Sequence, residues 1–187
     1  MEHVTEDRRV RKTKARIFEA LIELMMEKGY DRVTVQDIID RADVGRSTFY
    51  AHYRDKEAVL HSGFEQLRPA FEASEEDADP SLALFRHIGE YTHVYQAIAG
   101  RRGGHVVIAY LRRFLIELYG KRLEARIDPA REPSVPLDGV VEYLVSALIG
   151  IVQWGLERSE PATPEQLHGW FQQLVTPGVR KALGVTP

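Results

Sequence analysis

The residues best suited to chemistry in this sequence lie in one continuous stretch, residues 34–53. Its pattern predicts two short helices, 34–42 and 46–52, joined by a three-residue turn. This layout is a helix-turn-helix, in which the second helix lies in the major groove of DNA. The exposed side of that second helix would be formed by Arg46, Ser47, Thr48, Tyr50, Ala51 and His52. Such hydroxyl, cationic and small side chains suit base edges and phosphates.

Local signals support the turn and both helices. Thr34 is a good N-cap, and Asp37 three residues later makes a near capping box. Asp43 is one of the few residue types besides glycine that tolerates a left-handed turn conformation. The small core between the helices is expected from Ile38, Ile39, Ala42, Val44 and Phe49. The alternative is that a short polar helix after a turn forms only a solvated corner of the molecule.

Charge is unevenly distributed along the chain. The formal net charge is −3, which taken alone argues against a nucleic-acid partner. The N-terminal region, however, carries a basic run with no acid inside it. This basic run is Arg8, Arg9, Arg11, Lys12, Lys14 and Arg16. Because phosphate binding depends on a local positive face rather than on the sum, the run could follow phosphates or reach into a minor groove.

The segment of about residues 13–60 resembles the DNA-binding head of the tetracycline-repressor (TetR) family. The residues that carry the resemblance are Ile17, Phe18, Ala20, Leu24, Gly29, Tyr30, Val33, Thr34, Val35, Ile38, Ala42, residues 44–53, Asp55, Lys56, Glu57 and Leu60. The match is long and ordered, and it covers the first third of the chain. Two departures affect the tilt of the third helix: Asp43 replaces the usual glycine of the turn, and Gly45 stands where serine often caps that helix.

The resemblance implies a DNA-contact role for individual positions. These are Thr34, Arg46, Ser47, Thr48, Tyr50, His52 and Lys56. Thr34 would cap the second helix and touch a phosphate, and Lys56 would meet the DNA backbone. Residues 46–48 would face the major groove, whereas Tyr50 and His52 would contact backbone or bases.

The whole chain is predicted to be all-α, because helical spacing of apolar residues recurs and period-two alternation is nearly absent. Further helices are expected at 10–28, 56–71, 81–99, 104–127, 137–158 and 164–183. Thr163 and Pro164 would start the last of these as N-cap and first residue. The acidic segment 74–80, which ends in proline, is the clearest break. We expect a three-helix helix-turn-helix DNA-binding head at 1–60 and a helical ligand-binding and dimerisation body at 61–187.

The last two helices are candidates for a dimer interface. Segment 137–158 is apolar on nearly all sides, and such a helix must be covered on all sides. The last helix offers a matching stripe that includes Trp170 and Leu174. The family resemblance implies that these helices pair across a two-fold axis, so we expect a homodimer. On pattern alone, both helices could instead form an internal core.

Aromatic residues of the body are candidates for lining a small, mostly apolar ligand pocket. They are Phe64, Phe71, Phe85, Ile88, Tyr91, Tyr95, Tyr110, Phe114 and Trp154. We select Phe64, Tyr91, Tyr95, Tyr110, Phe114 and Trp154 as effector-binding residues. Aromatic residues at helical spacing also occur in ordinary cores, so core packing is the alternative for each.

Several functional classes have little support. The chain has no cysteine, and it lacks His-Glu-x-x-His, Gly-x-Ser-x-Gly and phosphate-loop motifs, so we expect neither an enzyme nor a metal or cofactor. Its polar, acidic start predicts no signal peptide. The apolar run 140–156 contains Glu142 and Gln153, which favours a buried helix over a membrane span. A cytoplasmic protein is expected.

The expected function is a ligand-responsive transcriptional repressor that binds a pseudo-palindromic double-stranded DNA operator as a homodimer. A small-molecule effector would weaken that binding. Two alternatives stay open. One is an activator or a ligand-independent architectural protein with the same DNA-binding head. The other is a helical protein–protein interaction module that does not bind DNA.

Overall fold

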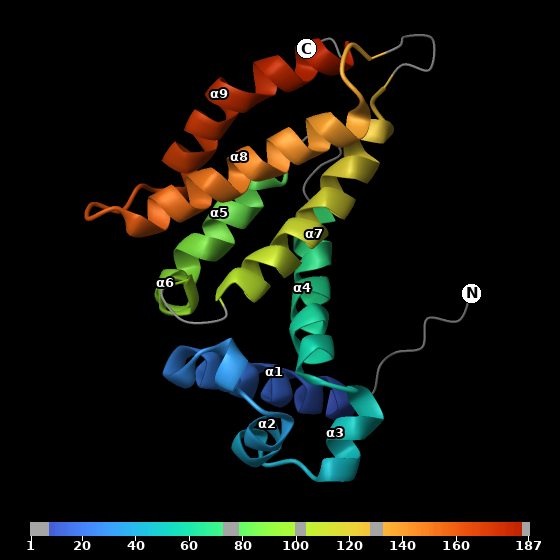
Figure 1. Cartoon of the computed structure of the whole chain (residues 1–187), viewed down its shortest axis with the longest axis vertical. Helices are drawn as coiled ribbons and strands as arrows, with labels where there is room; N and C mark the ends of the chain where they lie inside the picture. Colours follow the sequence, from blue (N-terminus) through green and yellow to red (C-terminus); the bar gives the residue numbers. More distant parts are fainter. Residues whose placement is uncertain (1–7, 73–78, 100–103, 128–132, 185–187) are drawn as a thin grey trace. The chain divides into compact units, whose positions relative to one another are not determined.

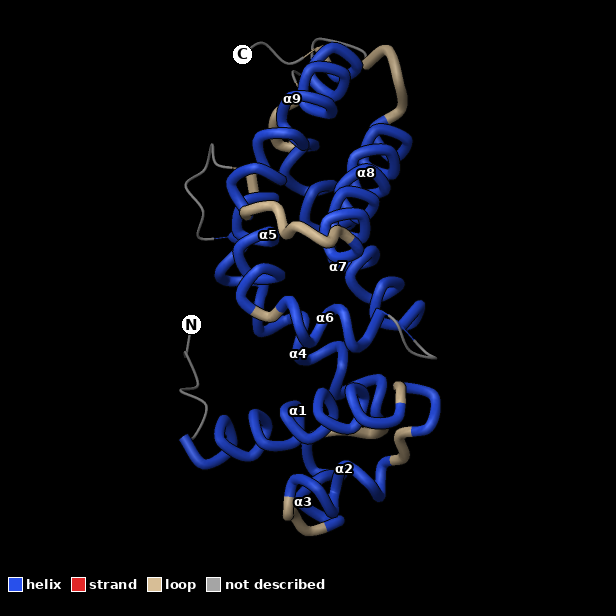
Figure 2. The backbone as a smooth tube through the Cα atoms, turned by 90° about the vertical axis from the view of Figure 1, so that its left-hand side faces the viewer, coloured by secondary structure: helices blue, strands red, loops and turns tan. Residues whose placement is uncertain are grey.

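The computed structural model describes residues 8–72, 79–99, 104–127 and 133–184. Within these ranges the regular elements are all helices, which confirms the predicted all-α fold (Figures 1 and 2). In chain order they are α1 (Arg8–Lys28), the short 3-10 helix η1 (Tyr30–Arg32), α2 (Val35–Ala42), α3 (Arg46–His52), α4 (Lys56–Glu72), α5 (Ser81–Glu90), α6 (Thr92–Ala99), α7 (Gly104–Glu124), α8 (Leu137–Glu157) and α9 (Pro164–Leu183).

The chain divides into two compact units. The first, which we call the head unit, comprises residues 1–67 and 97–107, and the second, the body unit, comprises residues 68–96 and 108–187. Helix α4 contributes residues to both, because the division falls after Leu67. The domain boundary expected after residue 60 stays a prediction.

The core of the head unit is built from the inward faces of α1 to α4. Its most deeply buried side chains are Ile17, Leu21, Met25, Ile38, Phe49, Val59 and Leu60. A Cβ placed on Gly63 of α4 would lie 2.0 Å from the ring of Phe18 on α1. The absence of a side chain at Gly63 therefore lets the Phe18 ring lie directly against α4. Gly29 ends α1 with φ 79°, a conformation that favours glycine.

In the body unit, α8 and α9 form an antiparallel pair (Figure 1). Helix α5 packs against α9. The rings of Phe85 on α5 and Phe171 on α9 meet edge to face, with centroids 6.4 Å apart. Helix α8 is long and apolar enough, by length and composition alone, to cross a membrane. Its residues Val145 and Leu148 are fully buried inside the body unit, as expected for a helix of a folded core.

A polar cluster fixes the start of α5. The carboxylate of Asp79 accepts hydrogen bonds from the Tyr119 hydroxyl of α7 at 2.7 Å and from Nε2 of Gln172 on α9 at 2.5 Å. Next to it, the buried hydroxyl of Ser81 lies 2.8 Å from Nδ1 of His168. Burial, together with the Asp79 charge, raises the pKa of Tyr119 well above its usual value, so the phenol stays a donor. The cluster thereby joins α5, α7 and α9.

The single helix predicted for residues 81–99 is two helices, α5 and α6, separated at Tyr91. Tyr91 has φ −110° and ψ 28°, outside the helical range. The hydroxyl of Thr92 lies 3.0 Å from the carbonyl oxygens of Ile88 and Gly89. A threonine hydroxyl bonded to carbonyls of the preceding turn bends a helix. The apolar periodicity continues through the bend, so it could not reveal the break.

Candidate nucleic-acid interface

Helix α3 is anchored by one buried ring and has a polar outer face. Phe49 is fully buried, and its ring meets that of Tyr53 at a centroid distance of 6.0 Å. Around this anchor, Arg46, Ser47, Tyr50 and Ala51 are exposed and Thr48 and His52 are partly exposed. The predicted exposed side of the second helix is thus the observed one. That these residues contact DNA stays a prediction.

The turn between α2 and α3 depends on Asp43. Its φ of 49° and ψ of 57° are left-handed, as predicted from its residue type. Arg16 of α1 donates from Nη2 to the backbone oxygen of Asp43 at 3.2 Å and lies 3.4 Å from its carboxylate. The Asp43 side chain is 96% exposed, so the ion pair itself is weak. The main effect of Arg16 is to hold the carbonyl of the turn.

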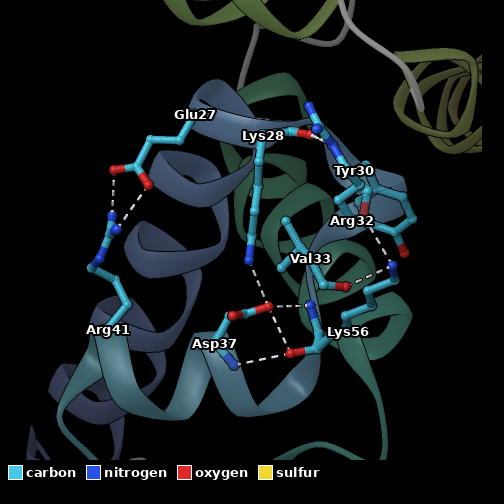
Figure 3. Close-up of polar contacts among 9 residues, drawn as sticks. Glu27, Lys28, Tyr30, Arg32, Val33, Asp37, Arg41 and Lys56 are labelled. Atoms are coloured by element: carbon cyan, nitrogen blue, oxygen red, sulfur yellow. Dashed lines mark hydrogen bonds and ion pairs between the residues drawn. The ribbon is translucent and has the colours of Figure 1, made fainter.

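Two groups of ion pairs connect α1 to α2 (Figure 3). Arg41 of α2 donates to Glu23 at 3.0 Å and to both carboxylate oxygens of Glu27, at 2.9 and 2.8 Å. These hydrogen bonds lower the pKa of Glu27 and raise that of Arg41. Arg41 and its acidic partners are exposed, so these ion pairs add little to the stability of the fold. Their main effect is to orient α2 against α1.

The second group centres on the carboxylate of Asp37 (Figure 3). It accepts hydrogen bonds from the backbone N–H of Thr34 at 2.7 Å and from the Thr34 hydroxyl at 2.6 Å, and Lys28 lies 2.8 Å away. The Thr34 oxygen in turn accepts from the Asp37 N–H, which completes the predicted capping box. The Lys28 and Thr34 contacts hold the pKa of Asp37 well below its usual range. The start of α2 is therefore tied to the end of α1.

Lys56, which was expected to meet the DNA backbone, has partners inside the head unit (Figure 3). Its ammonium donates to the backbone oxygens of Tyr30 and Val33, both at 2.9 Å, and lies 4.3 Å from the centroid of the Tyr30 ring. The lysine thus links the first turn of α4 to the η1 segment. Its DNA contact stays a prediction, to which the structure adds an anchoring role.

Arg46 contacts a residue that the sequence analysis did not select. Its Nη1 donates to Oε1 of Gln36 on α2 at 3.2 Å, and its guanidinium carbon lies 5.4 Å from the centroid of the Tyr50 ring. Nε2 of Gln36 in turn donates to Asp40 at 2.8 Å. The four-residue spacing of Gln36 and Asp40 could have suggested a pair on one face of a helix. Nothing in the sequence connected that pair to Arg46.

The basic run forms the start of α1. Arg8, Arg9, Arg11 and Lys12 are exposed, and the first turn of α1 contains no acidic residue. Cations at a helix N-terminus oppose the helix dipole, and like charges three or four residues apart repel each other. The cations in the first turn therefore do not stabilise α1 through its dipole, and an external anion would relieve their repulsion.

The predicted effector-binding residues occupy different environments. Phe64 is buried on α4 within the head unit. In the body unit, Phe114 is buried with its ring 5.7 Å from that of Phe71, an ordinary core position. Tyr110 lies under the guanidinium of Arg113, 4.9 Å from its ring centroid. Their effector contacts stay predictions.

Tyr91 and Tyr95 flank His87, with ring centroids 4.9 and 5.9 Å from the imidazole. Burial raises the pKa of Tyr95 to about 12 and lowers that of His87, so both rings are neutral near pH 7. Trp154 lies on the outer face of α8, where it is 45% exposed and meets Trp170 of α9 edge to face at 5.6 Å. Of the selected residues, Tyr91 and Tyr95 thus share His87 as a neighbour, and Trp154 has Trp170 as its neighbour.

The body unit contains a small cavity between α5, α6, α8 and the start of α9. Phe85 and Ile88, two of the pocket candidates, line it together with Gln96 and Leu167, whereas none of the six selected residues does. Its volume is about 50 Å³. Pockets for drug-sized ligands span about 300–1,000 Å³. The cavity as described would therefore have to widen to hold an effector.

Two family models match the chain. Residues 17–62 match "Bacterial regulatory proteins, tetR family", and residues 78–177 match "Transcriptional regulator C-terminal region". This chain belongs to the TetR family of transcriptional regulators. The TetR resemblance of the head is confirmed, and the family match extends over a body in which the sequence showed no sharp motif.

Known TetR-family and related regulators resemble the chain over most of its length. The uncharacterized HTH-type transcriptional regulator YxbF of Bacillus subtilis is 24% identical over 181 residues, which cover 90% of this chain and 46% of that protein. The chain thus spans about half the length of this relative. A TetR transcriptional regulator from Streptococcus agalactiae is 27% identical, with a TM-score of 0.66 over 93% of this chain and 99% of that one.

NalD of Pseudomonas aeruginosa, described as the secondary repressor of the MexAB-OprM multidrug efflux pump, shares the fold. It is 17% identical, with a TM-score of 0.52 over 92% of this chain and 98% of that one. These three relatives are transcriptional regulators rather than enzymes.

Proposed function

We propose that this TetR-family chain is a homodimeric repressor that binds a pseudo-palindromic operator through α3 and releases it when a small molecule binds the body unit. The observation that carries the proposal is the outward polar face of α3 above the buried ring of Phe49. Helix α2, which precedes α3, is held in a fixed orientation against α1 by the ion pairs of Arg41 with Glu23 and Glu27 and of Lys28 with Asp37. A helix that reads bases needs such support, because its side chains must be held to within a fraction of an ångström.

The basic run at the start of α1 would supply phosphate contacts beside the helix-turn-helix. Its exposed cations, among them Arg8, Arg11 and Lys12, lie where they weaken the helix that carries them. Each phosphate neutralised would add about 0.9 to the slope of log affinity against log salt. The net charge of −3 does not oppose this, because the basic run is local.

The outer face of the α8–α9 pair supports a homodimer. Tyr143 and Trp154 of α8 and Trp170 and Leu174 of α9 are exposed large apolar residues, and Leu174 is 70% exposed. A Cβ on Gly150, Gly169 or Gly178 would meet nothing within 4 Å, so a second backbone could approach closely. Exposed apolar residues grouped on a helix pair mark an interaction surface. We propose a second copy of the chain as the partner, because the resulting dimer would present two α3 helices to the operator.

The operator would then have two half-sites. Two α3 helices related by a two-fold axis would enter successive major grooves on one face of DNA, about 34–36 Å apart. The half-sites would be inverted repeats, because the symmetry of the protein is imposed on the DNA. In each half-site, the bases or the DNA backbone would be contacted by Thr34, Arg46, Ser47, Thr48, Tyr50, His52 and Lys56.

The effector would be small and mostly apolar, with a polar group that can hydrogen-bond to the hydroxyls of Tyr91 and Tyr95. Tyr91, between α5 and α6, and Tyr95 of α6 lie next to the neutral His87 and offer ring faces and hydroxyl tips. The effector would favour a dimer conformation in which the α3 helices have the wrong spacing. Its effect is limited to its differential affinity for the two conformations, typically about 1–3 kcal/mol, or roughly 5- to 150-fold in operator affinity. As a cytoplasmic repressor, the protein would meet both DNA and effector.

The test begins with the purified chain and the DNA upstream of its own gene. Footprinting should show one protected site with two symmetric halves, and sedimentation should show a dimer. A variant with Ser47→Ala and Thr48→Ala should keep its fold and lose protection of that site. Absence of any protected site would contradict the DNA-binding proposal and favour a protein-interaction module.

Operator affinity is then measured with and without each compound of a set of small aromatic molecules. At least one compound should weaken binding by 5-fold or more, within the usual range of allosteric coupling. If none does, the switching part is wrong and an architectural protein is favoured. A reporter gene behind the operator decides the sign: transcription should rise when the regulator is deleted, as for a repressor, and a fall would indicate an activator.

A further inference from the structure

Arg46 differs from Arg16 and Arg41 of the head unit in the kind of partner it has. Arg41 is neutralised by Glu23 and Glu27, and Arg16 lies beside the carboxylate of Asp43. Arg46 instead donates to the neutral amide of Gln36, at 3.2 Å. An amide holds a guanidinium in place without cancelling its charge. The positive charge at the start of α3 is therefore oriented and still available to an external acceptor.

The amide that holds Arg46 is itself held. Nε2 of Gln36 donates to Oδ1 of Asp40 at 2.8 Å, so its Oε1 is directed to the guanidinium. On the other side, the ring of Tyr50 lies 5.4 Å from the guanidinium carbon. A free arginine side chain loses rotamer entropy when it is fixed by a contact. Part of that cost is already met in the unbound protein, as in other preorganised sites.

The guanidinium has five N–H donors in a planar fork, and the Gln36 contact uses one of them. Arg46 is the first residue of α3, and the first residues of a recognition helix are the ones that meet base edges. In the major groove, O6 and N7 of guanine form the pair of acceptors that an arginine fork fits best. Adenine presents a donor in place of O6, and pyrimidines lack both acceptors.

We infer that Arg46 reads one guanine in each operator half-site and that Gln36 is the positioning residue that sets its guanidinium for that contact. The inference rests on the proposed function, because it needs α3 in the major groove. It adds the base that is read and a role for a residue of α2. Gln36 carries no charge, so it acts on base preference rather than on general attraction to DNA.

The experiment selects bound duplexes from a random pool with the full-length chain and then measures affinity at fixed salt. The wild-type chain should select one guanine at the same place in both half-sites. Replacing that guanine should weaken binding roughly 5- to 150-fold, the range for one good bidentate contact. The same measurements are made for Arg46→Ala, Gln36→Ala and the double variant, with thermal unfolding as the check on folding.

Arg46→Ala should abolish the preference for that guanine and leave preferences at other positions unchanged. Gln36→Ala should reduce the preference several-fold while the salt slope stays that of the wild type. The double variant should match Arg46→Ala alone, because a residue that acts only through Arg46 has nothing left to position. A residue with a merely structural role would instead lower the unfolding midpoint and weaken binding at every position.

Three results would overturn the inference. If Arg46→Ala weakens binding to all sequences equally and lowers the salt slope by about 0.9, Arg46 contacts a phosphate and the DNA-binding proposal still stands. If Gln36→Ala changes base preference as much in the Arg46→Ala variant as in the wild-type chain, Gln36 does not act through the arginine. If the wild-type chain enriches no sequence at all, the proposed function itself fails along with the inference.

Discussion

Replacing Lys56 by methionine separates anchoring of the head unit from contact with DNA. Lys56 is half-buried, and its ammonium donates to the backbone oxygens of Tyr30 and Val33, both at 2.9 Å. It also lies 4.3 Å from the Tyr30 ring centroid. Methionine keeps most of the aliphatic stem and removes the charge. Both carbonyl oxygens would then lose their cationic donor.

The expected loss of stability follows from these contacts. A hydrogen bond to a charged group is worth about 1.5–3 kcal/mol, and a cation–π contact about 0.5–2 kcal/mol. Because the site is half-buried, water can replace part of what is lost. We therefore expect a net loss of about 2 kcal/mol in the free energy of unfolding. For a chain of this size, each kcal/mol corresponds to about 2–4 °C, so the unfolding midpoint should fall by roughly 4–8 °C.

The matched control is Arg54→Met, which removes the same charge from a side chain that is 86% exposed and pairs with Asp55. Its midpoint should change little, because an exposed ion pair is worth about 0–1 kcal/mol. Thermal unfolding followed by circular dichroism compares the two variants. Operator binding is then measured well below both midpoints across a range of salt concentrations. If Lys56 also contacts a phosphate, the salt slope of Lys56→Met should be smaller by about 0.9.

The two readouts refute different parts of the reasoning. If Lys56→Met unfolds at the same temperature as Arg54→Met, the contacts with the Tyr30 and Val33 carbonyls do not anchor the head unit. If the midpoint falls while the salt slope stays unchanged, the lysine is structural only and the predicted DNA contact is wrong.

Two further predictions concern the start of α2 and the α8–α9 face. Because the pKa of Asp37 is lowered in the folded chain, its contribution to stability is present at neutral pH and is lost as pH falls below about 4, the unfolded value. Urea denaturation should therefore show that the stability gap between wild type and Asp37→Asn narrows from pH 6 to pH 3; a gap that stays constant would contradict the assigned cause. Leu174→Glu places a charge on a side chain that is 70% exposed, so it should leave the unfolding midpoint nearly unchanged and shift sedimentation from dimer to monomer. If the variant stays a dimer, the α8–α9 face is excluded as the dimer interface. Lys181→Glu, an exposed substitution on the same helix, is the control for the change in charge.

The features predicted correctly were those encoded within a few residues of each other. The capping box at Thr34 needs a partner only three residues away and is present, and Thr163 is the N-cap of α9 with Pro164 as its first residue, as predicted. The left-handed turn at Asp43 follows from the residue type itself. The break at Tyr91 escaped prediction, because the apolar spacing continues through it; hydrogen bonds from the Thr92 hydroxyl to the carbonyls of Ile88 and Gly89 accompany the break.

The candidate site was predictable as a set of exposed residues and not as a set of contacts. Polar residues around the buried Phe49 follow from helical periodicity, so the outer face of α3 could be predicted. The partner of Arg46 is ten residues away on another helix, and the orientation of α2 against α3 decides whether they meet. Trp154 fitted a pocket by composition, yet its side of α8 faces outward against Trp170.

By itself, the sequence determined the helices, their caps, the turn and the TetR-like head, because helix formation and capping depend on neighbours within one or two turns. The tertiary structure decided which charges are engaged inside the protein. Lys56 meets carbonyls 23 and 26 positions away, and Arg41 meets acids 14 and 18 positions away. Side chains so far apart in sequence meet only when helices pack. The same packing gives Arg46 a neutral partner, so its positive charge stays available for the guanine that we propose it reads.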